Sequence, residues 1–189
     1  MNNIGLIFIG ILSIIQGCIL MTRKKLVIKG EHQNIYASLI FIAPFIQIAI
    51  ETIFYDQTSI IPIILISIVI LFPFLIFSFN RERNTYYIEN SSIEMIIPII
   101  TRILNEKDIS YEEREKAIFL KSYDSSIYYK KSLDTVRLDF KDIQNISLQE
   151  EIIEELKRSI KENKSKIFPF SGFLFIGLGV LIFLVDKYI

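Results

Sequence analysis

The sequence of 189 residues lacks most of the side chains with which proteins bind metals or perform nucleophilic catalysis. It contains one cysteine, Cys18, one histidine, His32, and no tryptophan. An intrachain disulfide and a zinc site built from several cysteines or histidines are therefore excluded. Basic and acidic residues balance at 21 each, so no overall charge attracts nucleic acid. The chain also lacks a phosphate-binding loop, a dinucleotide fingerprint and a nucleophile elbow. We expect no enzymatic activity, cofactor, metal or nucleic acid.

Long apolar runs are abundant instead. A membrane-spanning helix needs about 20 apolar residues to cross roughly 30 Å of hydrocarbon, and a helix satisfies its own backbone hydrogen bonds there. So short a chain has too little polar sequence to cover several such runs as the core of a soluble protein. The sequence predicts three transmembrane helices within residues 1–79 and a fourth within 167–189. Their expected ranges are about 4–21, 35–55, 60–79 and 167–185.

Basic residues next to these runs predict an orientation. The loop 22–34 contains four lysines and arginines, whereas the turn Asp56–Ser59 contains none. Because basic loops stay on the cytoplasmic side, we expect this loop and residues 80–166 in the cytoplasm and both termini outside. Heavy use of Ile, Lys and Asn indicates an AT-rich genome, and hence a bacterial cytoplasmic membrane. The fragment "RKKLVIK" in the loop is either a basic connection near lipid headgroups or an amphipathic segment on the inner membrane surface.

Residues 80–166 have the composition of a folded domain. They contain no glycine and one proline, Pro98, which excludes a flexible linker. Their hydrophobic periodicity predicts a strand, a helix, three strands and a second helix. The predicted fold class is therefore a membrane protein with four transmembrane α-helices and a small cytoplasmic α+β domain. In this β-α-β-β-β-α domain, inserted between spans three and four, two helices cover an antiparallel sheet.

Local signals set the expected ends of these elements. Ser91 with Glu94, and Ser147 with Glu150, have the spacing of capping boxes at helix starts. Pro98 falls inside the first helix and should kink it or mark a later start. The segments "YDSS" and "KSLD" are typical of turns between antiparallel strands.

Three polar side chains within the apolar runs are candidate functional residues: Gln16, Gln47 and Glu51. Glu51 lies near the expected outer interface, where a carboxylate can simply anchor the helix. Alternatively, Pro44, Gln47 and Glu51 share one helix face and line a path for an ion or a peptide. A hydrogen bond between Gln16 and Gln47 would be structural.

Small residues in the first and fourth runs predict close helix packing. The packing partner is either another helix of the same bundle or a second copy of the chain. These residues are Gly10, Ser13 and Gly17 in the first run, and Ser171, Gly172, Gly177 and Gly179 in the fourth.

Tyrosines of the polar segment form a second candidate site. Tyr86, Tyr87, Tyr128 and Tyr129 could make a face that binds a peptide or a lipid headgroup, although packing within a half-buried sheet also explains them. The sequence favours a non-enzymatic scaffold, regulatory or protective protein in the lipid bilayer, whose cytoplasmic domain binds a partner protein or self-associates. The alternative is a subunit of a small transporter or channel.

Overall fold

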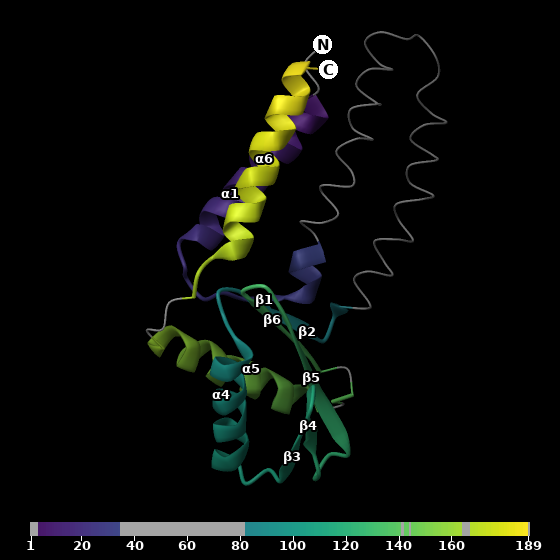
Figure 1. Ribbon diagram of the computed structural model, residues 1–189. Helices are drawn as coiled ribbons and strands as arrows, with labels where there is room; N and C mark the ends of the chain where they lie inside the picture. Colours follow the sequence, from purple (N-terminus) through teal and green to yellow (C-terminus); the bar gives the residue numbers. More distant parts are fainter. Residues whose placement is uncertain (1–3, 35–81, 141, 144, 164–166, 189) are drawn as a thin grey trace, which may run out of the picture. The chain divides into compact units, whose positions relative to one another are not determined.

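The computed structural model describes residues 4–34, 82–140, 142–143, 145–163 and 167–188 (Figure 1). They divide into two compact units. One unit contains helices α1 (Ile4–Met21) and α6 (Phe170–Tyr188). The other, called the sheet domain below, combines residues 22–30 with residues 84–170.

The sheet domain is built on a six-stranded antiparallel sheet with the order β1-β2-β6-β5-β4-β3. Strands β3 to β6 follow one another as hairpins, and β2 pairs with β6 from the other side. The strands are β1 (Val27–Lys29), β2 (Thr85–Ile88), β3 (Tyr111–Arg114), β4 (Ala117–Leu120), β5 (Ser125–Ser132) and β6 (Thr135–Asp139). The helices are α4 (Ile93–Glu106) and α5 (Ile146–Glu162).

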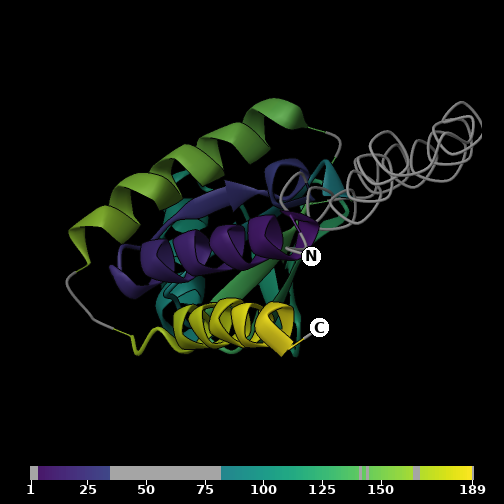
Figure 2. The ribbon, with the colours of Figure 1, turned by 90° about the horizontal axis from the view of Figure 1, so that it is seen from above.

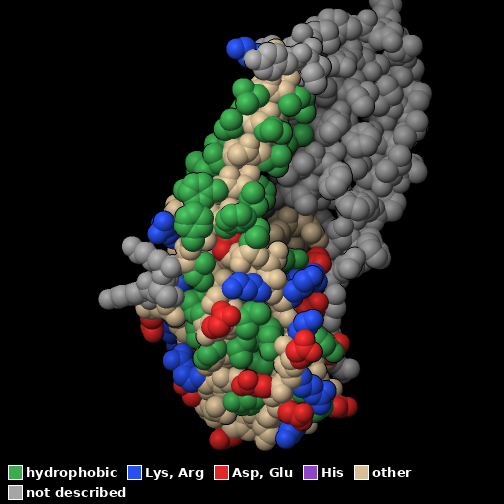
Figure 3. Space-filling model, in the orientation of Figure 1, with side chains coloured by type: hydrophobic (Ala, Val, Ile, Leu, Met, Phe, Trp, Pro, Cys, Tyr) green, Lys and Arg blue, Asp and Glu red, His purple; other side chains and the backbone are tan. Residues whose placement is uncertain are grey.

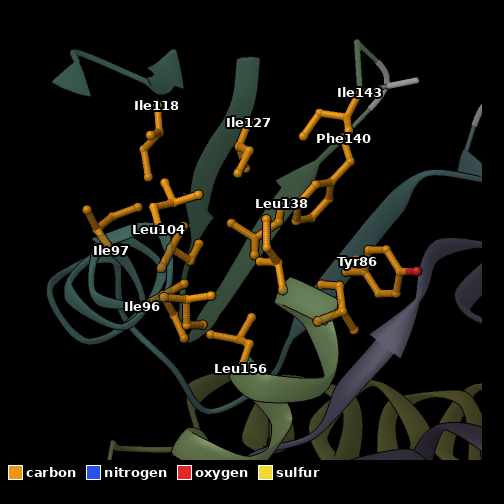
Figure 4. Close-up of a cluster of buried hydrophobic side chains, with 14 of the residues drawn as sticks. Tyr86, Ile96, Ile97, Leu104, Ile118, Ile127, Leu138, Phe140, Ile143 and Leu156 are labelled. Atoms are coloured by element: carbon orange, nitrogen blue, oxygen red, sulfur yellow. The ribbon is translucent and has the colours of Figure 1, made fainter. Parts of the chain in front are cut away.

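The core lies between the sheet and the helices α4 and α5. Figure 4 shows side chains from the strands pointing toward those from both helices. Tyr86 packs edge-on against Phe140, with 5.8 Å between their ring centroids. Burying one such large apolar side chain contributes about 1.5–3 kcal/mol, so this layer holds the sheet and helices together. Its fully buried members include Ile96, Leu104, Ile118, Ile127, Leu138, Phe140 and Leu156.

The fold class predicted from the sequence is wrong in the number of strands of the sheet domain. Two further strands are present, so the order is β-β-α-β-β-β-β-α. Val27–Lys29, expected in a basic loop, form β1 and pair with β2, with Val27 opposite Ile88. Tyr111–Arg114, the other strand that the sequence did not predict, form β3 opposite β4. Both are short edge strands, and neither shows enough alternation to be recognised without its partner.

The predicted helix starts are also wrong, by one residue for α4 and by two residues for α5. Ser92 is the N-cap residue of α4, while the Ser91 hydroxyl donates to the Ile88 carbonyl at 2.6 Å. α5 begins after Asn145, whose side chain accepts from the Leu148 backbone N–H at 3.1 Å. Serine and asparagine both favour the N-cap position, so the sequence offers two candidates at each start: Ser91 and Ser92 for α4, and Asn145 and Ser147 for α5. The two predicted turns, in contrast, are confirmed by the β4–β5 and β5–β6 pairing.

The prediction of a four-span, multi-pass membrane protein is wrong. Among the described residues, one helical stretch is long and apolar enough to cross a membrane, Phe170–Lys187 of α6. The apolar part of α1, Leu6–Met21, is shorter. The predicted spans 35–55 and 60–79 lie outside the described residues. A hydropathy run reports only composition and length, and it does not distinguish a spanning helix from one that packs against another element.

Helices α1 and α6 lie side by side and meet at glycines (Figure 2). A Cβ added at Gly17 would stand 2.8 Å from the Gly172 carbonyl oxygen. At the other end of the contact, a Cβ added at Gly179 would stand 2.8 Å from the Gly10 carbonyl oxygen. The two backbones therefore touch, which confirms the predicted close packing for these four glycines. Gly177 is outside the contact, with nothing within 4 Å of its added Cβ.

Candidate functional site on the open face of the sheet

Strand alternation divides the sheet residues between two faces. One face packs on α4 and α5, and the other, called the open face below, carries half-buried and exposed long side chains together with the buried Thr85, Ala117 and Ser126. Residues that pair directly across antiparallel strands share a face, so the strand register identifies the members of the open face. Its long side chains are Tyr87 of β2, Arg137 and Asp139 of β6, Tyr128 and Lys130 of β5, Phe119 of β4, and Glu112 and Arg114 of β3, which pair at 3.6 Å.

Two arginines on the open face stand over aromatic rings. The Arg114 guanidinium carbon lies 4.2 Å from the centroid of the Phe119 ring. The Arg137 guanidinium carbon lies 5.8 Å from the centroid of the Tyr87 ring, and its Nη2 is 3.4 Å from Asp139 Oδ2. A guanidinium stacked in this way is held in place while its N–H groups point outward in its own plane.

Tyr128 is the most prominent aromatic ring between these pairs. It lies directly opposite Asp139 in the strand register, and 46% of its surface is exposed. Lys130 lies two residues further along β5, opposite Arg137. The open face therefore alternates rings with cations over five neighbouring strands, β2, β6, β5, β4 and β3.

The structure separates the four predicted tyrosines. Tyr87 and Tyr128 lie on the open face, whereas Tyr86 and Tyr129 point to the face covered by helices. Tyr86 is buried, and its hydroxyl accepts from Gln149 Nε2 at 3.4 Å. The Tyr129 hydroxyl donates to the Arg114 carbonyl at 3.1 Å, and burial, with Glu113 and Glu115 nearby, raises the pKa of Tyr129. Consecutive residues of a strand point to opposite faces of the sheet. Two adjacent tyrosines therefore cannot place both rings on one face.

Of the other predicted candidates, Gln16 is half-buried in α1. Gln47 and Glu51 lie outside the described residues, as does any contact between Gln16 and Gln47. The described residues hold no group of three or more His, Cys, Asp or Glu side chains that could bind a metal.

No family model matches the chain, and neither a curated protein nor a solved structure is similar to it. The function is therefore argued from the residues themselves.

Sequence reasoning missed a buried polar cluster at one end of β2 and β6. Glu89 and Asp134 are only 6% and 2% exposed. The Thr135 hydroxyl donates to Glu89 Oε2 at 2.6 Å. Burial raises the pKa of Glu89, the Thr135 hydrogen bond opposes this rise, and the nearby Asp134 charge adds to it. Both acids follow strand or turn signals in the sequence, where a carboxylate normally faces water, so no local pattern marked them as buried.

This polar cluster joins the segment after α1 to the end of β2, within the sheet domain. The Glu89 backbone N–H donates to the Leu26 carbonyl at 2.9 Å, and the Asn90 side chain donates to the Lys24 carbonyl at 2.9 Å. Asn90 has a φ of 52°, a left-handed conformation that asparagine adopts more readily than most residues. The cluster therefore has a structural role that accounts for its burial: it fixes residues 24–26 beside β2.

Proposed function

We propose that the protein is a non-enzymatic interaction protein, anchored in a bacterial cytoplasmic membrane by α6, whose sheet domain binds a partner protein through the open face. The observation that carries this proposal is the row of stacked Arg–aromatic pairs beside exposed Tyr128. The described side chains of this face are built for binding, since they join flat apolar rings to fixed donors.

Tyrosine, arginine and phenylalanine are residues that protein interfaces favour, because each buries a large area on binding. The aromatic rings also lose few rotamers, since each has only two side-chain torsions. Here they stand on strands of a packed sheet, so their positions are set before a partner arrives. Such pre-organisation lowers the entropy cost of association. The three cations Arg114, Arg137 and Lys130 outnumber the two acids Glu112 and Asp139 on this face, which favours a partner surface that carries carboxylates among apolar groups.

The anchoring part of the proposal rests on α6. Its apolar side chains are exposed along the helix, among them Phe173, Leu178, Leu181 and Leu184. Figure 3 shows hydrophobic side chains along this helical unit, whereas Lys, Arg, Asp and Glu are interspersed over the sheet domain. Apolar surface of this extent on a helix of membrane-spanning length fits lipid. Lys161, Lys164 and Lys166 precede the helix in the sequence, which favours a cytoplasmic position for the domain.

The experiment is affinity purification of the tagged full-length chain from native membranes, followed by identification of the proteins that co-purify. The test variant is Tyr128→Ser with Arg137→Ser, which removes one ring and one cation from the open face. The matched control is Tyr123→Ser, because Tyr123 is a tyrosine of similar exposure, 42%, in the turn between β4 and β5.

We expect a partner that co-purifies with the wild type and with Tyr123→Ser, and that is lost with the open-face variant. Truncation of a hot-spot side chain costs about 2 kcal/mol or more of binding free energy, so the affinity for the partner should fall more than tenfold. A partner that is retained equally by all three proteins would exclude the open face as its binding site.

A further inference from the structure

Lys25 joins two segments that are far apart in the sequence. Its Nζ donates to the Asn163 carbonyl oxygen at 2.6 Å and to Asn163 Oδ1 at 3.1 Å. Lys25 follows α1 by four residues, and Asn163 is the C-cap residue of α5. A cation at the carboxyl end of a helix interacts favourably with the helix dipole, so this contact fixes the segment after α1 against the end of α5.

This contact gathers basic residues from both segments within the sheet domain. Arg23 and Lys24 precede Lys25, and Lys157, Arg158 and Lys161 belong to the last turns of α5. All five side chains are exposed, and we call them the basic patch. Two acids accompany them, Glu155, which pairs with Arg158 at 3.1 Å, and Glu162. The cations therefore remain in excess.

The acids of α5 are concentrated at its other end. Glu150, Glu151 and Glu154 lie in the first nine residues of the helix, and Glu151 pairs at 2.6 Å with Lys107, the C-cap residue of α4. The positive end of the sheet domain is thus the end at which the chain enters from α1. Arg23 follows Met21, the last residue of α1, by two residues, which span at most about 7 Å when extended.

We propose that the basic patch binds the headgroups of anionic phospholipids in the membrane that α6 enters. The charge of the patch complements a phosphate-rich surface, and the patch is continuous in the chain with the apolar helices. Arg23 and Lys24 lie two and three residues after α1 in the sequence, and Lys161 lies nine residues before α6. The proposal rests on the anchoring by α6, but it does not depend on partner binding at the open face.

The patch should therefore distinguish anionic from zwitterionic lipid. Each Lys or Arg near an anionic membrane surface strengthens binding by about fivefold, and this attraction declines within one Debye length. Removal of two patch charges should weaken anionic lipid binding by at least tenfold and leave binding of phosphatidylcholine unchanged.

The test uses the purified full-length chain in detergent micelles that contain equal amounts of phosphatidylglycerol and phosphatidylcholine. Native mass spectrometry counts the lipid molecules of each kind that stay bound. The test variant is Lys24→Gln with Lys161→Gln, and the charge-preserving variant is Lys24→Arg with Lys161→Arg. The matched control is Lys116→Gln with Lys121→Gln, which removes two exposed lysines near β4.

We expect the wild type, the arginine variant and the matched control to retain phosphatidylglycerol preferentially, and the glutamine patch variant to lose this preference. Raising ammonium acetate from about 50 to about 300 mM should weaken the wild-type preference, which tests the proposal even if the glutamine variant folds poorly. Equal retention of both lipids by the wild type, or an equal loss in the matched control, would overturn the proposal. That result would not affect the proposal that the open face binds a partner protein. The anchoring by α6 would be refuted by a different result, the absence of the chain from the membrane fraction of cells.

Discussion

The hydroxyl of Thr135 donates a 2.6 Å hydrogen bond to Oε2 of Glu89, a carboxyl group that is almost completely buried. This bond joins the start of β6 to the residue that follows β2, beside a second buried acid, Asp134. Because two acids share a site with little water, protonation of Glu89 is coupled to the stability of the sheet domain.

The first prediction concerns pH. The folded domain raises the pKa of Glu89 above its ordinary value of 4.5, mainly through burial. The folded state therefore holds this proton more tightly than the unfolded state does. The stabilisation is fully present below pH 4.5 and is lost as the pH rises through the folded pKa. Glu89→Gln cannot ionise, so we expect this variant not to lose that stability as the pH rises. At neutral pH it should be at least as stable as the wild type.

Thermal unfolding of the full-length chain in detergent, followed by circular dichroism between about pH 4 and pH 8, measures this effect. The matched control is Glu112→Gln, since Glu112 is an exposed acid of β3. If the thermal stability of Glu89→Gln and that of the wild type depend on pH in the same way, Glu89 is not a buried carboxyl group with a raised pKa.

The second prediction concerns the donor. Thr135→Val keeps the shape of the side chain but removes the hydroxyl that donates to Glu89. A buried acceptor that has no donor costs about 1–3 kcal/mol. We expect Thr135→Val to lower the free energy of unfolding by this amount at neutral pH. In the Glu89→Gln background the same substitution should cost less, because no buried charge remains. Chemical denaturation of the four proteins gives the coupling energy, and strictly additive effects would contradict the account.

The third prediction concerns the contact between α1 and α6. A Cβ at Gly17 would stand 2.8 Å from the Gly172 carbonyl oxygen and 2.9 Å from the Ile176 backbone nitrogen, so the two helices must move apart. We expect Gly17→Ala to lower the unfolding free energy by about 1–3 kcal/mol, as other overpacking substitutions do.

Gly177→Ala is the matched control for this contact, because nothing lies within 4 Å of its added Cβ. Alanine has the higher helix propensity, so this control should be neutral or stabilising by up to about 1 kcal/mol. Thermal unfolding in detergent compares both variants with the wild type. Destabilisation of equal size at Gly17 and Gly177 would show that the glycine contact does not hold the helices together.

Much of the sheet domain could be predicted from the sequence. Strands β4, β5 and β6 and the helices α4 and α5 fall where hydrophobic periodicity placed them, because each buries one face on a common core. Strand β2 is likewise present at "TYYI". The edge strands β1 and β3 were missed, since a strand of three or four residues becomes visible only through its pairing.

The candidate site was harder to predict. Tyr87 and Tyr128 were named from their residue type, but the sequence did not show that Tyr86 and Tyr129 would face the helices. That division follows from the strand register, which local patterns do not specify. The stacking of Arg114 on Phe119 and of Arg137 on Tyr87 depends on the same register. Glu89 and Asp134 were missed because burial of an acid is a tertiary property.

The most direct test of the central claim is site-specific photo-crosslinking in cells. A photoreactive phenylalanine analogue replaces Tyr128 on the open face or, as the control, Tyr123 in the neighbouring turn, within the otherwise native full-length chain. We predict one defined protein adduct from position 128, absent from position 123 and strongly reduced when Arg137→Ser is added. Adducts of equal yield from both positions, or none from position 128, would contradict a partner-binding role for the open face.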